Sequence, residues 1–174
     1  LDLAKRVKGP RASAWLLHQQ VWAEGGYANI VWPKILATAG LSEQDTAFAT
    51  ELAYGSMRRF GQWSAILERA SNRTASGVQP EVWWLLVLGT HQLLAMSTPV
   101  HAAVNEMVAL AKSLGYSRAS GFVNAVLRRV SERELDQWVE IVTNSAPSEH
   151  AAWGLRLAHP EWIVEQLEAA LARE

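Results

Sequence analysis

Arginine provides the most specific chemistry in this sequence, because its planar guanidinium can form forked hydrogen bonds with the oxygens of a phosphate. Two adjacent pairs occur, Arg58-Arg59 and Arg128-Arg129, and helical periodicity places each pair at the end of a predicted helix. A cation at the C-terminal end of a helix also stabilises the helix dipole, typically by about 0.3–1 kcal/mol. The two pairs are therefore equally consistent with a phosphate-binding surface and with helix stabilisation.

A second basic group lies at the start of the chain, around a Gly9-Pro10 break that ends a predicted basic arm, residues 1–9. A cation in the first turn of a helix opposes the dipole, so helix stability does not account for the last member of this group. The group favours contact with the phosphates of RNA or DNA. Its members are Lys5, Arg6, Lys8 and Arg11.

The formal net charge of −1 results from cancellation between two parts of the chain. Residues 1–129 carry 13 lysines and arginines against 8 aspartates and glutamates, whereas residues 130–174 carry 3 against 9. A basic body is thus followed by an acidic extension, which we do not expect to touch a nucleic acid.

Other kinds of catalytic or ligand site are poorly represented. The chain has no cysteine, which excludes thiol nucleophiles, thiolate metal ligands and disulfides. His91, His101 and Glu106 belong to two different predicted helices and have no metal-ligand spacing, so we predict no metal site. The sequence also lacks the G-x-S-x-G, G-x-G-x-x-G and Walker patterns of serine hydrolases and nucleotide-binding loops.

Nearly every segment from Pro10 onward has helical periodicity, and no alternating run of β-branched residues indicates a strand. We therefore predict an all-α fold, a bundle of about seven helices followed by a C-terminal helical extension. The expected domains are residues 10–145 for the bundle and residues 146–174 for a linker and the start of a next subdomain. The helices are predicted at 10–24, 28–39, 42–59, 62–69, 80–96, 99–115 and 119–129, with later ones beginning near 131 and 160.

Several residues predict where these helices begin and end, and which helix is buried. Ser42 and Ser131 each begin a capping-box pattern, Pro33 predicts a kink or break, and Gly61 allows a break before the next helix. The segment after Pro80 is apolar on almost all sides, which predicts the buried centre of the bundle.

Nine tryptophans could either fill the core or stack on nucleobases. Helical spacing favours the core for five of them, namely Trp15, Trp22, Trp32, Trp83 and Trp84.

The termini and the longest apolar run of the sequence indicate where in the cell the protein is located. The basic start lacks the apolar segment of a secretory signal, and the longest strongly apolar run, Val82 to Leu88, is far shorter than the ~20 residues that span a bilayer. We predict a cytoplasmic protein without a membrane partner. Because the chain starts with Leu1 and stops within a helical sequence, we also expect a piece of a longer protein.

Three segments in combination carry a family resemblance: ATELAYGSMRRF (49–60), PVHAAVNE (99–106) and GFVNAVLRR (121–129). With them the chain resembles the NusB-like RNA-binding fold, and more closely the N-terminal domain of the RsmB (Sun or Fmu) family of ribosomal RNA cytosine-C5 methyltransferases. The resemblance covers about residues 11–131 and returns at HPEW (159–162).

The resemblance implies an RNA-binding and targeting domain of an S-adenosylmethionine-dependent 16S rRNA 5-methylcytosine methyltransferase. Its partners would be small-subunit ribosomal RNA and its own C-terminal methyltransferase domain. The residues that match the basic RNA-contacting region of NusB are Lys5, Arg6, Lys8 and Arg11. The family's two catalytic cysteines and its cofactor domain have no counterpart here, so this chain would perform no catalysis and hold no cofactor.

Two asparagines within the resembling segments, Asn105 and Asn124, are interpreted as structural connections between helices. Asn124 is flanked by apolar residues, so its amide is expected to be buried and hydrogen-bonded. Its replacement by alanine would then cost about 1–3 kcal/mol of stability.

Two other functions remain open at this stage. One is a stand-alone NusB-type transcription antitermination factor, against which the extension through HPEW (159–162) argues. The other is an architectural domain that docks its own methyltransferase domain and adds nothing to RNA affinity.

Overall fold

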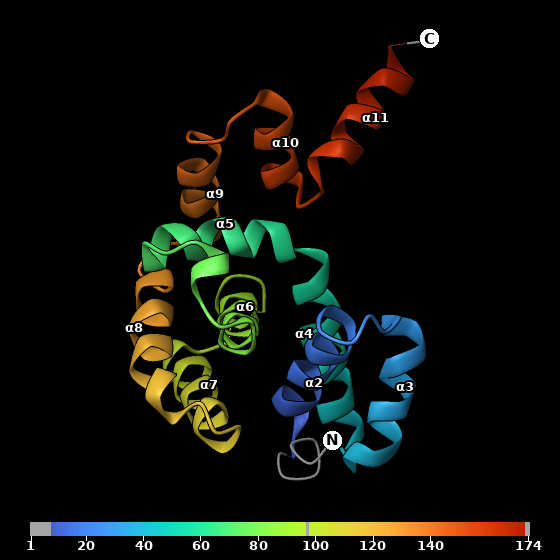
Figure 1. The fold of residues 1–174 in the computed structure, drawn as a ribbon, viewed down its shortest axis with the longest axis vertical. Coiled ribbons are helices and arrows are strands. Elements are labelled where there is room, and N and C mark those ends of the chain that lie inside the picture. The colour runs from blue at the N-terminus through green and yellow to red at the C-terminus, as the bar shows by residue number, and fades with distance from the viewer. Residues whose placement is uncertain (1–7, 97, 173–174) are drawn as a thin grey trace.

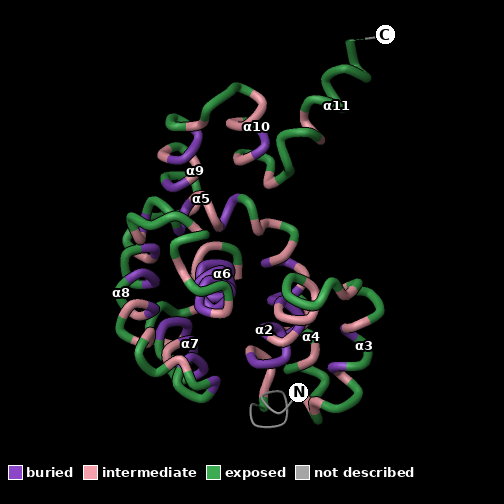
Figure 2. The backbone as a smooth tube through the Cα atoms, in the orientation of Figure 1, coloured by how far each residue is buried: buried purple, intermediate pink, exposed green. Residues whose placement is uncertain are grey.

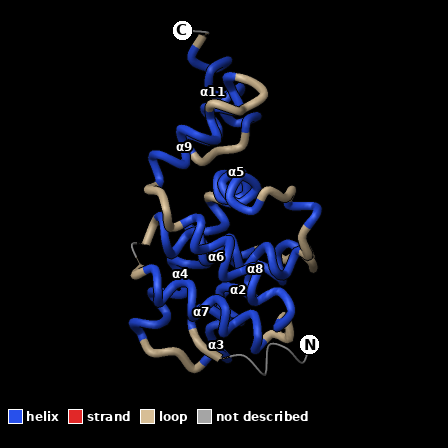
Figure 3. Tube along the Cα trace, turned by 90° about the vertical axis from the view of Figure 1, so that its left-hand side faces the viewer, coloured by secondary structure: helices blue, strands red, loops and turns tan. Residues whose placement is uncertain are grey.

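The structure is a computed structural model that describes residues 8–96 and 98–172. These residues form ten α-helices and two single-turn 3-10 helices, and no strand occurs among them (Figure 1, Figure 3). The all-α prediction is confirmed, with helices α2 to α8 forming a bundle and α9 to α11 extending from it. The helices are α2 (Pro10–Trp22), α3 (Ala28–Ala39), α4 (Glu43–Arg58), α5 (Phe60–Ser71), η1 (Ala75–Gly77), α6 (Pro80–Leu94), α7 (Val100–Ser113), η2 (Ser117–Ala119), α8 (Ser120–Val130), α9 (Leu135–Thr143), α10 (Glu149–Leu157) and α11 (Glu161–Leu171).

Local sequence signals begin and end several of these helices. Ser42 caps α4 as predicted, because its Oγ accepts a hydrogen bond from the backbone N–H of Asp45 at 3.1 Å. Pro80 occupies the first turn of α6, where its missing N–H costs nothing. Helix α3 ends at Gly40, whose φ of +61° is a left-handed conformation that favours glycine. Pro33 lies inside α3, so the predicted break does not occur there.

Two other predicted boundaries are displaced. Helices α4 and α5 are separated at Arg59, and Gly61 lies within α5. The capping box of α9 is formed by Glu134 and Gln137, one turn after the predicted start at Ser131. The hydroxyl of Ser131 instead donates to a carbonyl at the end of α8, which keeps this residue with the preceding helix. Helix α10, which begins where the predicted linker ends, is not among the predicted helices.

Helix α6 is the centre of the bundle, as predicted. Every residue from Val82 to Gln92 is buried, and α6 is in contact with α2, α4, α5, α7 and α8 (Figure 2). Burial of one leucine or valine side chain typically contributes about 1.5–3 kcal/mol, so this helix is the main apolar contribution to the fold.

Tryptophan side chains fill much of the remaining core. Of the five assigned to the core, four have exposed fractions of 5% or less: Trp15, Trp32, Trp83 and Trp84. The prediction is wrong for Trp22, whose side chain is 49% exposed at the end of α2 and lies against Phe60. Trp22 is the last residue of α2 and lines a cleft between the bundle and α10, which leaves part of its ring open to solvent.

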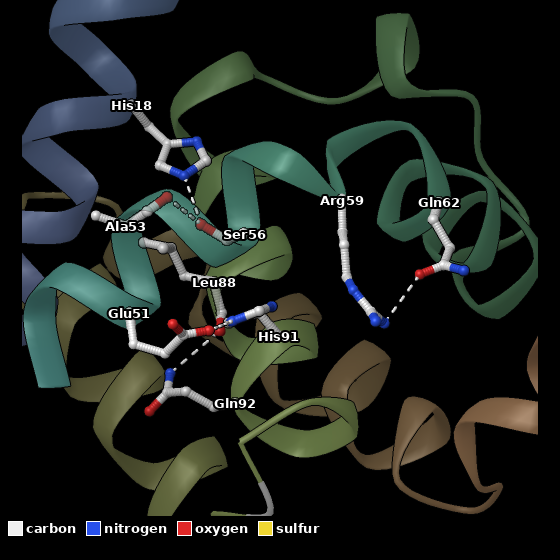
Figure 4. Close-up of polar contacts among 9 residues, drawn as sticks. All are labelled: His18, Glu51, Ala53, Ser56, Arg59, Gln62, Leu88, His91 and Gln92. Carbon is white, nitrogen blue, oxygen red and sulfur yellow. Dashed lines mark hydrogen bonds and ion pairs between the residues drawn. The ribbon is translucent and has the colours of Figure 1, made fainter. Parts of the chain in front are cut away.

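Two buried histidines lie where α2, α4 and α6 meet (Figure 4). The Ser56 hydroxyl donates its proton to the carbonyl of Ala53. Its oxygen therefore acts as the acceptor toward Nε2 of His18, which lies 2.8 Å away. Nε2 of His91 lies 3.5 Å from a carboxylate oxygen of Glu51. Burial lowers the pKa of His18 to about 3, with the nearby His91 as the second cause, and burial also lowers the pKa of His91.

The last three helices continue the chain away from the bundle. Helix α9 contacts α5, α10 contacts α9 and α5, and α11 lies mainly against α10 (Figure 1). The buried side chain of Gln62 contributes to this arrangement, since its Nε2 donates to the carbonyl of Leu155 on α10 at 2.7 Å. No helix in the described part of the chain is both long and apolar enough to span a membrane.

We predict that the two buried histidines make the fold acid-sensitive. A histidine that is neutral in the native state has its full stabilising effect above its unfolded pKa of about 6.5, and that effect declines as the pH falls toward the native pKa. Urea denaturation between pH 6.5 and 4 should show stability falling by up to about 1.4 kcal/mol per pH unit for each such histidine. His18→Gln, which retains a donor for Ser56, should make this dependence shallower.

The exposed His101 provides the matched control for a histidine-to-glutamine change, because His101→Gln alters a surface side chain and no buried contact. Identical pH profiles for wild type and His18→Gln would show that His18 does not remain neutral in the native state.

We also predict that the close approach of α6 and α8 depends on Gly89. A Cβ added there would lie 2.6 Å and 2.7 Å from the two Cδ atoms of Leu127, which is fully buried. Gly89→Ala should therefore lower the free energy of unfolding by about 1–3 kcal/mol. Gly121→Ala, at a position in α8 with open space around the added Cβ, should be neutral or stabilising by about 0.5 kcal/mol. Equal thermal denaturation of the two variants would contradict the packing argument.

Candidate nucleic-acid interface

The basic arm is represented in the structure by its last lysine. Lys5 and Arg6 lie outside the described residues, and Lys8 is exposed immediately before α2. A pocket of about 180 Å³ lies beside it, between the start of α2 and the second half of α7, and Lys8 and Arg11 are among its lining residues.

Arg11 is committed to contacts within the protein. Its Nε donates to the side-chain oxygen of Gln92 at 2.7 Å, and its guanidinium carbon lies 4.9 Å from the centre of the Phe48 ring. Glu106 is 4.0 Å away, and only 21% of the Arg11 side chain is exposed. Burial lowers the pKa of Arg11, which nevertheless stays charged, and the charge of Glu106 opposes the shift. These contacts connect α2 with α4, α6 and α7, which explains a cation in the first turn of α2.

The first arginine pair ends α4. The side chain of Arg58 is exposed, whereas Arg59 is partly buried and donates to the side-chain oxygen of Gln62 at 3.3 Å (Figure 4). The guanidinium of Arg59 also lies 5.5 Å from the centre of the Trp63 ring. Arg58 is thus the member of this pair that is accessible to a ligand.

The second pair ends α8, and its two members have different surroundings. Nε of Arg128 donates to the side-chain oxygen of Asn124 within the same helix, at 3.1 Å. Arg129 donates to the backbone carbonyl of Ala70 at 3.2 Å, so it caps the last turn of α5 and not its own helix. Both side chains remain exposed, and a guanidinium has five N–H donors, so neither contact uses its full capacity.

The two asparagines do not connect helices in the way predicted. Asn105 is exposed, and Asn124 is only partly buried, with its side-chain oxygen bonded to Arg128 one turn further along α8. The apolar neighbours of Asn124 in the sequence point to other faces of the helix, because successive residues of a helix are about 100° apart. Its expected burial is therefore wrong, and a surface substitution of this kind usually changes stability by no more than about 0.5 kcal/mol.

The predicted cations form three separate groups. Lys8 and Arg11 lie at the end of the bundle where the chain begins, and the two arginine pairs lie at the two ends of α5 (Figure 1). A 12-residue helix is about 18 Å long at 1.5 Å per residue, which sets the scale of this separation.

Two further arginines join the group at the C-terminal end of α5. Arg69 is exposed in the last turn of α5, and Arg73 in the following loop lies with its guanidinium carbon 5.7 Å from the centre of the Phe122 ring on α8. We call Arg69, Arg73, Arg128 and Arg129 the α5–α8 arginine surface. The four-residue spacing of Arg69 and Arg73 in the sequence indicates that the two could lie close together. The sequence does not show that α5 contacts α8, which brings them near Arg128 and Arg129.

The electrostatic surroundings leave this surface positive. None of its four arginines forms an ion pair with another of the residues that the structure describes. The carboxylate of the neighbouring Glu68 accepts a hydrogen bond from the backbone N–H of Ala75 at 2.8 Å. Unpaired guanidiniums on one surface are suited to binding several phosphate oxygens.

The described residues show no candidate metal site. Across residues 8–96 and 98–172, histidine, aspartate and glutamate side chains do not gather in a group of three that could hold a metal ion.

Comparison with known proteins gives a consistent family assignment. The NusB family matches residues 10–132. The chain is 37% identical over 180 residues to a protein of Mycobacterium tuberculosis that is provisionally named a methyltransferase, with 97% of this chain and 39% of that protein covered. It is 28% and 27% identical, each over 166 residues, to the ribosomal RNA small subunit methyltransferase B of Shigella flexneri and of Escherichia coli O157:H7, with 95% of this chain and 36% of each relative covered.

The chain thus spans less than two fifths of the length of these relatives, and the match lies in their N-terminal region. The helices that carry the α5–α8 arginine surface fall within the matched residues 10–132. Sequence match and all-helical bundle agree, and the chain belongs to the NusB family.

Proposed function

We propose that this chain is the RNA-binding and targeting domain of a 16S ribosomal RNA 5-methylcytosine methyltransferase. The observation that carries the proposal is the NusB-family bundle in a chain whose relatives include methyltransferases of small-subunit ribosomal RNA. The bundle supplies an unpaired cationic surface, which is what a backbone-binding domain requires.

The phosphate contacts are assigned to the α5–α8 arginine surface, with Arg58 and Lys8 as further cations on other parts of the bundle. Lys5, Arg6, Arg11 and Arg59 remain in the proposed interface as well, although Arg11 and Arg59 act mainly through contacts inside the protein. RNA that follows this surface would be recognised through its backbone, and bases would have to be read elsewhere.

The methyl transfer itself belongs to another part of the longer protein. The chain contains no cysteine, and its described residues have no strand–loop–helix unit of the kind that binds S-adenosylmethionine. The residues present therefore do not fit this cofactor, which we assign to the parent enzyme. An enzyme that modifies ribosomal RNA would work in the cytoplasm.

The acidic extension supports a protein partner. Helices α10 and α11 are held together by the ion pair of His150 with Glu168, and they enclose a largely apolar groove of about 550 Å³. Trp153, Leu157 and Leu167 line this groove and are exposed. Exposed apolar surface of this kind marks an interaction site, and its acidic rim does not suit RNA. We assign this groove to the methyltransferase domain of the same protein.

A stand-alone antitermination factor fits less well. The described helices continue through α9, α10 and α11 after the family match ends at residue 132. The relatives aligned with nearly the whole chain are ribosomal RNA methyltransferases.

We predict that the α5–α8 arginine surface determines the salt dependence of RNA binding. Arg69→Gln with Arg73→Gln removes two cations, and each lost phosphate contact should reduce the slope of log K against log salt by about 0.7–0.9. Binding of a ribosomal RNA fragment to the 174-residue chain, measured across a salt series, should therefore show a slope that is shallower by about 1.4–1.8.

Lys34→Gln is the matched control, because Lys34 is an exposed cation on α3, away from the α5–α8 arginine surface. A wild-type chain that binds no RNA at low salt would overturn the proposed function. A double variant with the slope of wild type would remove the α5–α8 arginine surface from the interface.

We also predict that the α10–α11 groove binds the methyltransferase domain. With this chain and the downstream domain produced as separate polypeptides, Leu167→Glu should weaken their association at least about 10-fold, since a buried leucine typically contributes 1.5–3 kcal/mol. Ile30→Glu on α3 is a suitable control, because Ile30 is 53% exposed and Leu167 is 56% exposed. Calorimetric titration that gives the same affinity for both variants would contradict this assignment.

A further inference from the structure

The exposed Trp22 belongs to a cleft in which, of the cations proposed to contact phosphate with an exposed side chain, only Arg58 lies. The cleft has a volume of about 440 Å³, within the range of about 300–1,000 Å³ that is typical of small-ligand sites. One wall is formed by the ends of α2 and α4 and the start of α5, and the opposite wall by α10 and the turn before α11. It therefore lies between the NusB-family bundle and the helices that follow it.

The bundle wall of the cleft is aromatic. The rings of Trp22 and Phe60 have centroids 4.9 Å apart and an angle of 37° between their planes. This contact supports one side of the indole, while 49% of Trp22 remains exposed. A supported aromatic face that opens into a cleft can stack with a nucleobase, and such stacking is tolerant of base identity because every base has a π-face.

Among the polar groups that line the cleft, one cation is available to bind a ligand. The buried Gln62 is committed to Arg59 and Leu155, and Glu161 accepts a hydrogen bond from Ser148. The remaining polar groups are the exposed Arg58 and the ring of His159, whose Nδ1 lies 2.7 Å from the carbonyl of Leu157. Arg58 can therefore hold a phosphate beside the aromatic wall.

Charge and shape favour a nucleotide over a protein segment as the occupant. The α10–α11 groove is lined by apolar residues, His150 and two glutamates and has no arginine or lysine among its lining residues. The Trp22 cleft combines a flat aromatic surface with Arg58 and has a single carboxylate, that of Glu161. Met57, Leu155 and Pro160 add to the apolar lining, but about 440 Å³ corresponds to only about one turn of a helix 10–12 Å in diameter, which is too short for the anchors of a helix bound in a groove.

We propose that the Trp22 cleft binds one unpaired nucleotide of the RNA, with the base stacked on Trp22 and the adjacent phosphate at Arg58. The proposal rests on the proposed function and adds a base-binding site to a surface that otherwise contacts only the backbone. It also implies that single-stranded RNA binds more tightly than a duplex of the same sequence, because paired bases cannot enter the cleft.

The test measures binding of the 174-residue chain to a labelled 12-nucleotide RNA without self-complementarity, and to the same strand annealed to its complement. Trp22→Ala should weaken binding of the single strand about 5- to 150-fold, which is the loss expected for one stacked base, and should leave duplex binding unchanged. Trp22→Phe should retain most of the affinity. Trp153→Ala is the matched control, because Trp153 is 46% exposed and lines the other groove.

Two further measurements test the phosphate contact at Arg58 and the base contact at Trp22 separately. Arg58→Ala should make the salt slope for the single strand shallower by about 0.7, whereas Lys34→Ala, at an exposed cation of α3 that does not line the cleft, should weaken RNA binding less. Wild type should show quenching of tryptophan fluorescence on binding the single strand, and Trp22→Phe should lose that component.

The outcomes separate this proposal from the proposed function. If the chain binds RNA with a steep salt dependence and Trp22→Ala binds the single strand as well as wild type does, the cleft does not hold a base and the proposed function stands. If the wild-type chain binds no RNA, both are wrong. If Trp22→Ala weakens association with the methyltransferase domain and not with single-stranded RNA, the cleft is a protein contact and the nucleotide assignment is overturned.

Discussion

Helix α6 is in contact with five other α-helices, and its residues from Val82 to Gln92 are all buried. A helix that is apolar on all sides has no stable position at the surface, so the remaining helices of the bundle must cover it. This requirement places α5 across one end of the bundle, and with it the residues that begin and end α5 (Figure 1). The positions of Arg59 and of the α5–α8 arginine surface thus follow from the burial of α6.

The burial of α6 also brings polar groups into the interior. His91 and Gln92 lie on the same helix as the buried leucines; Gln92 has partners on neighbouring helices, whereas neither ring nitrogen of His91 forms a hydrogen bond within the described residues. Gln92 accepts a hydrogen bond from Arg11, and His91 lies near Glu51. Arg11, assigned from its position to nucleic acid, is thereby used to satisfy a buried amide. A cation near the chain terminus is not automatically a ligand-binding group when a buried acceptor lies within its reach.

Sequence reasoning was most accurate where one local signal determines an element. Ser42 and Pro80 marked the starts of α4 and α6, and the apolar segment after Pro80 identified the core. Predictions from sequence were less accurate for residues whose burial or contacts depend on a neighbouring helix. Trp22 has the helical spacing of a core residue, but the bundle leaves the end of α2 uncovered, and Asn124 is only partly buried although Val123 and Val126 beside it are buried. The same limitation applies to the candidate site, since Arg73 joins Arg129 only through the contact between α5 and α8.

The distribution of charge and apolar surface bears on how the chain can work with a second domain. The cations of the α5–α8 arginine surface form no ion pair within the described residues, whereas the exposed apolar residues of α10 and α11 have glutamates beside them. The glutamates of the α10–α11 groove disfavour RNA there, so the proposed RNA-binding and protein-binding surfaces would be separate, and α10 would approach RNA only at the Trp22 cleft. Gln62 links the two parts, because its amide joins α5 to α10 and its side-chain oxygen accepts from Arg59. A domain docked on α10 and α11 would therefore be held in a fixed orientation relative to the bundle, and RNA bound to the bundle would be presented to that domain from a defined direction.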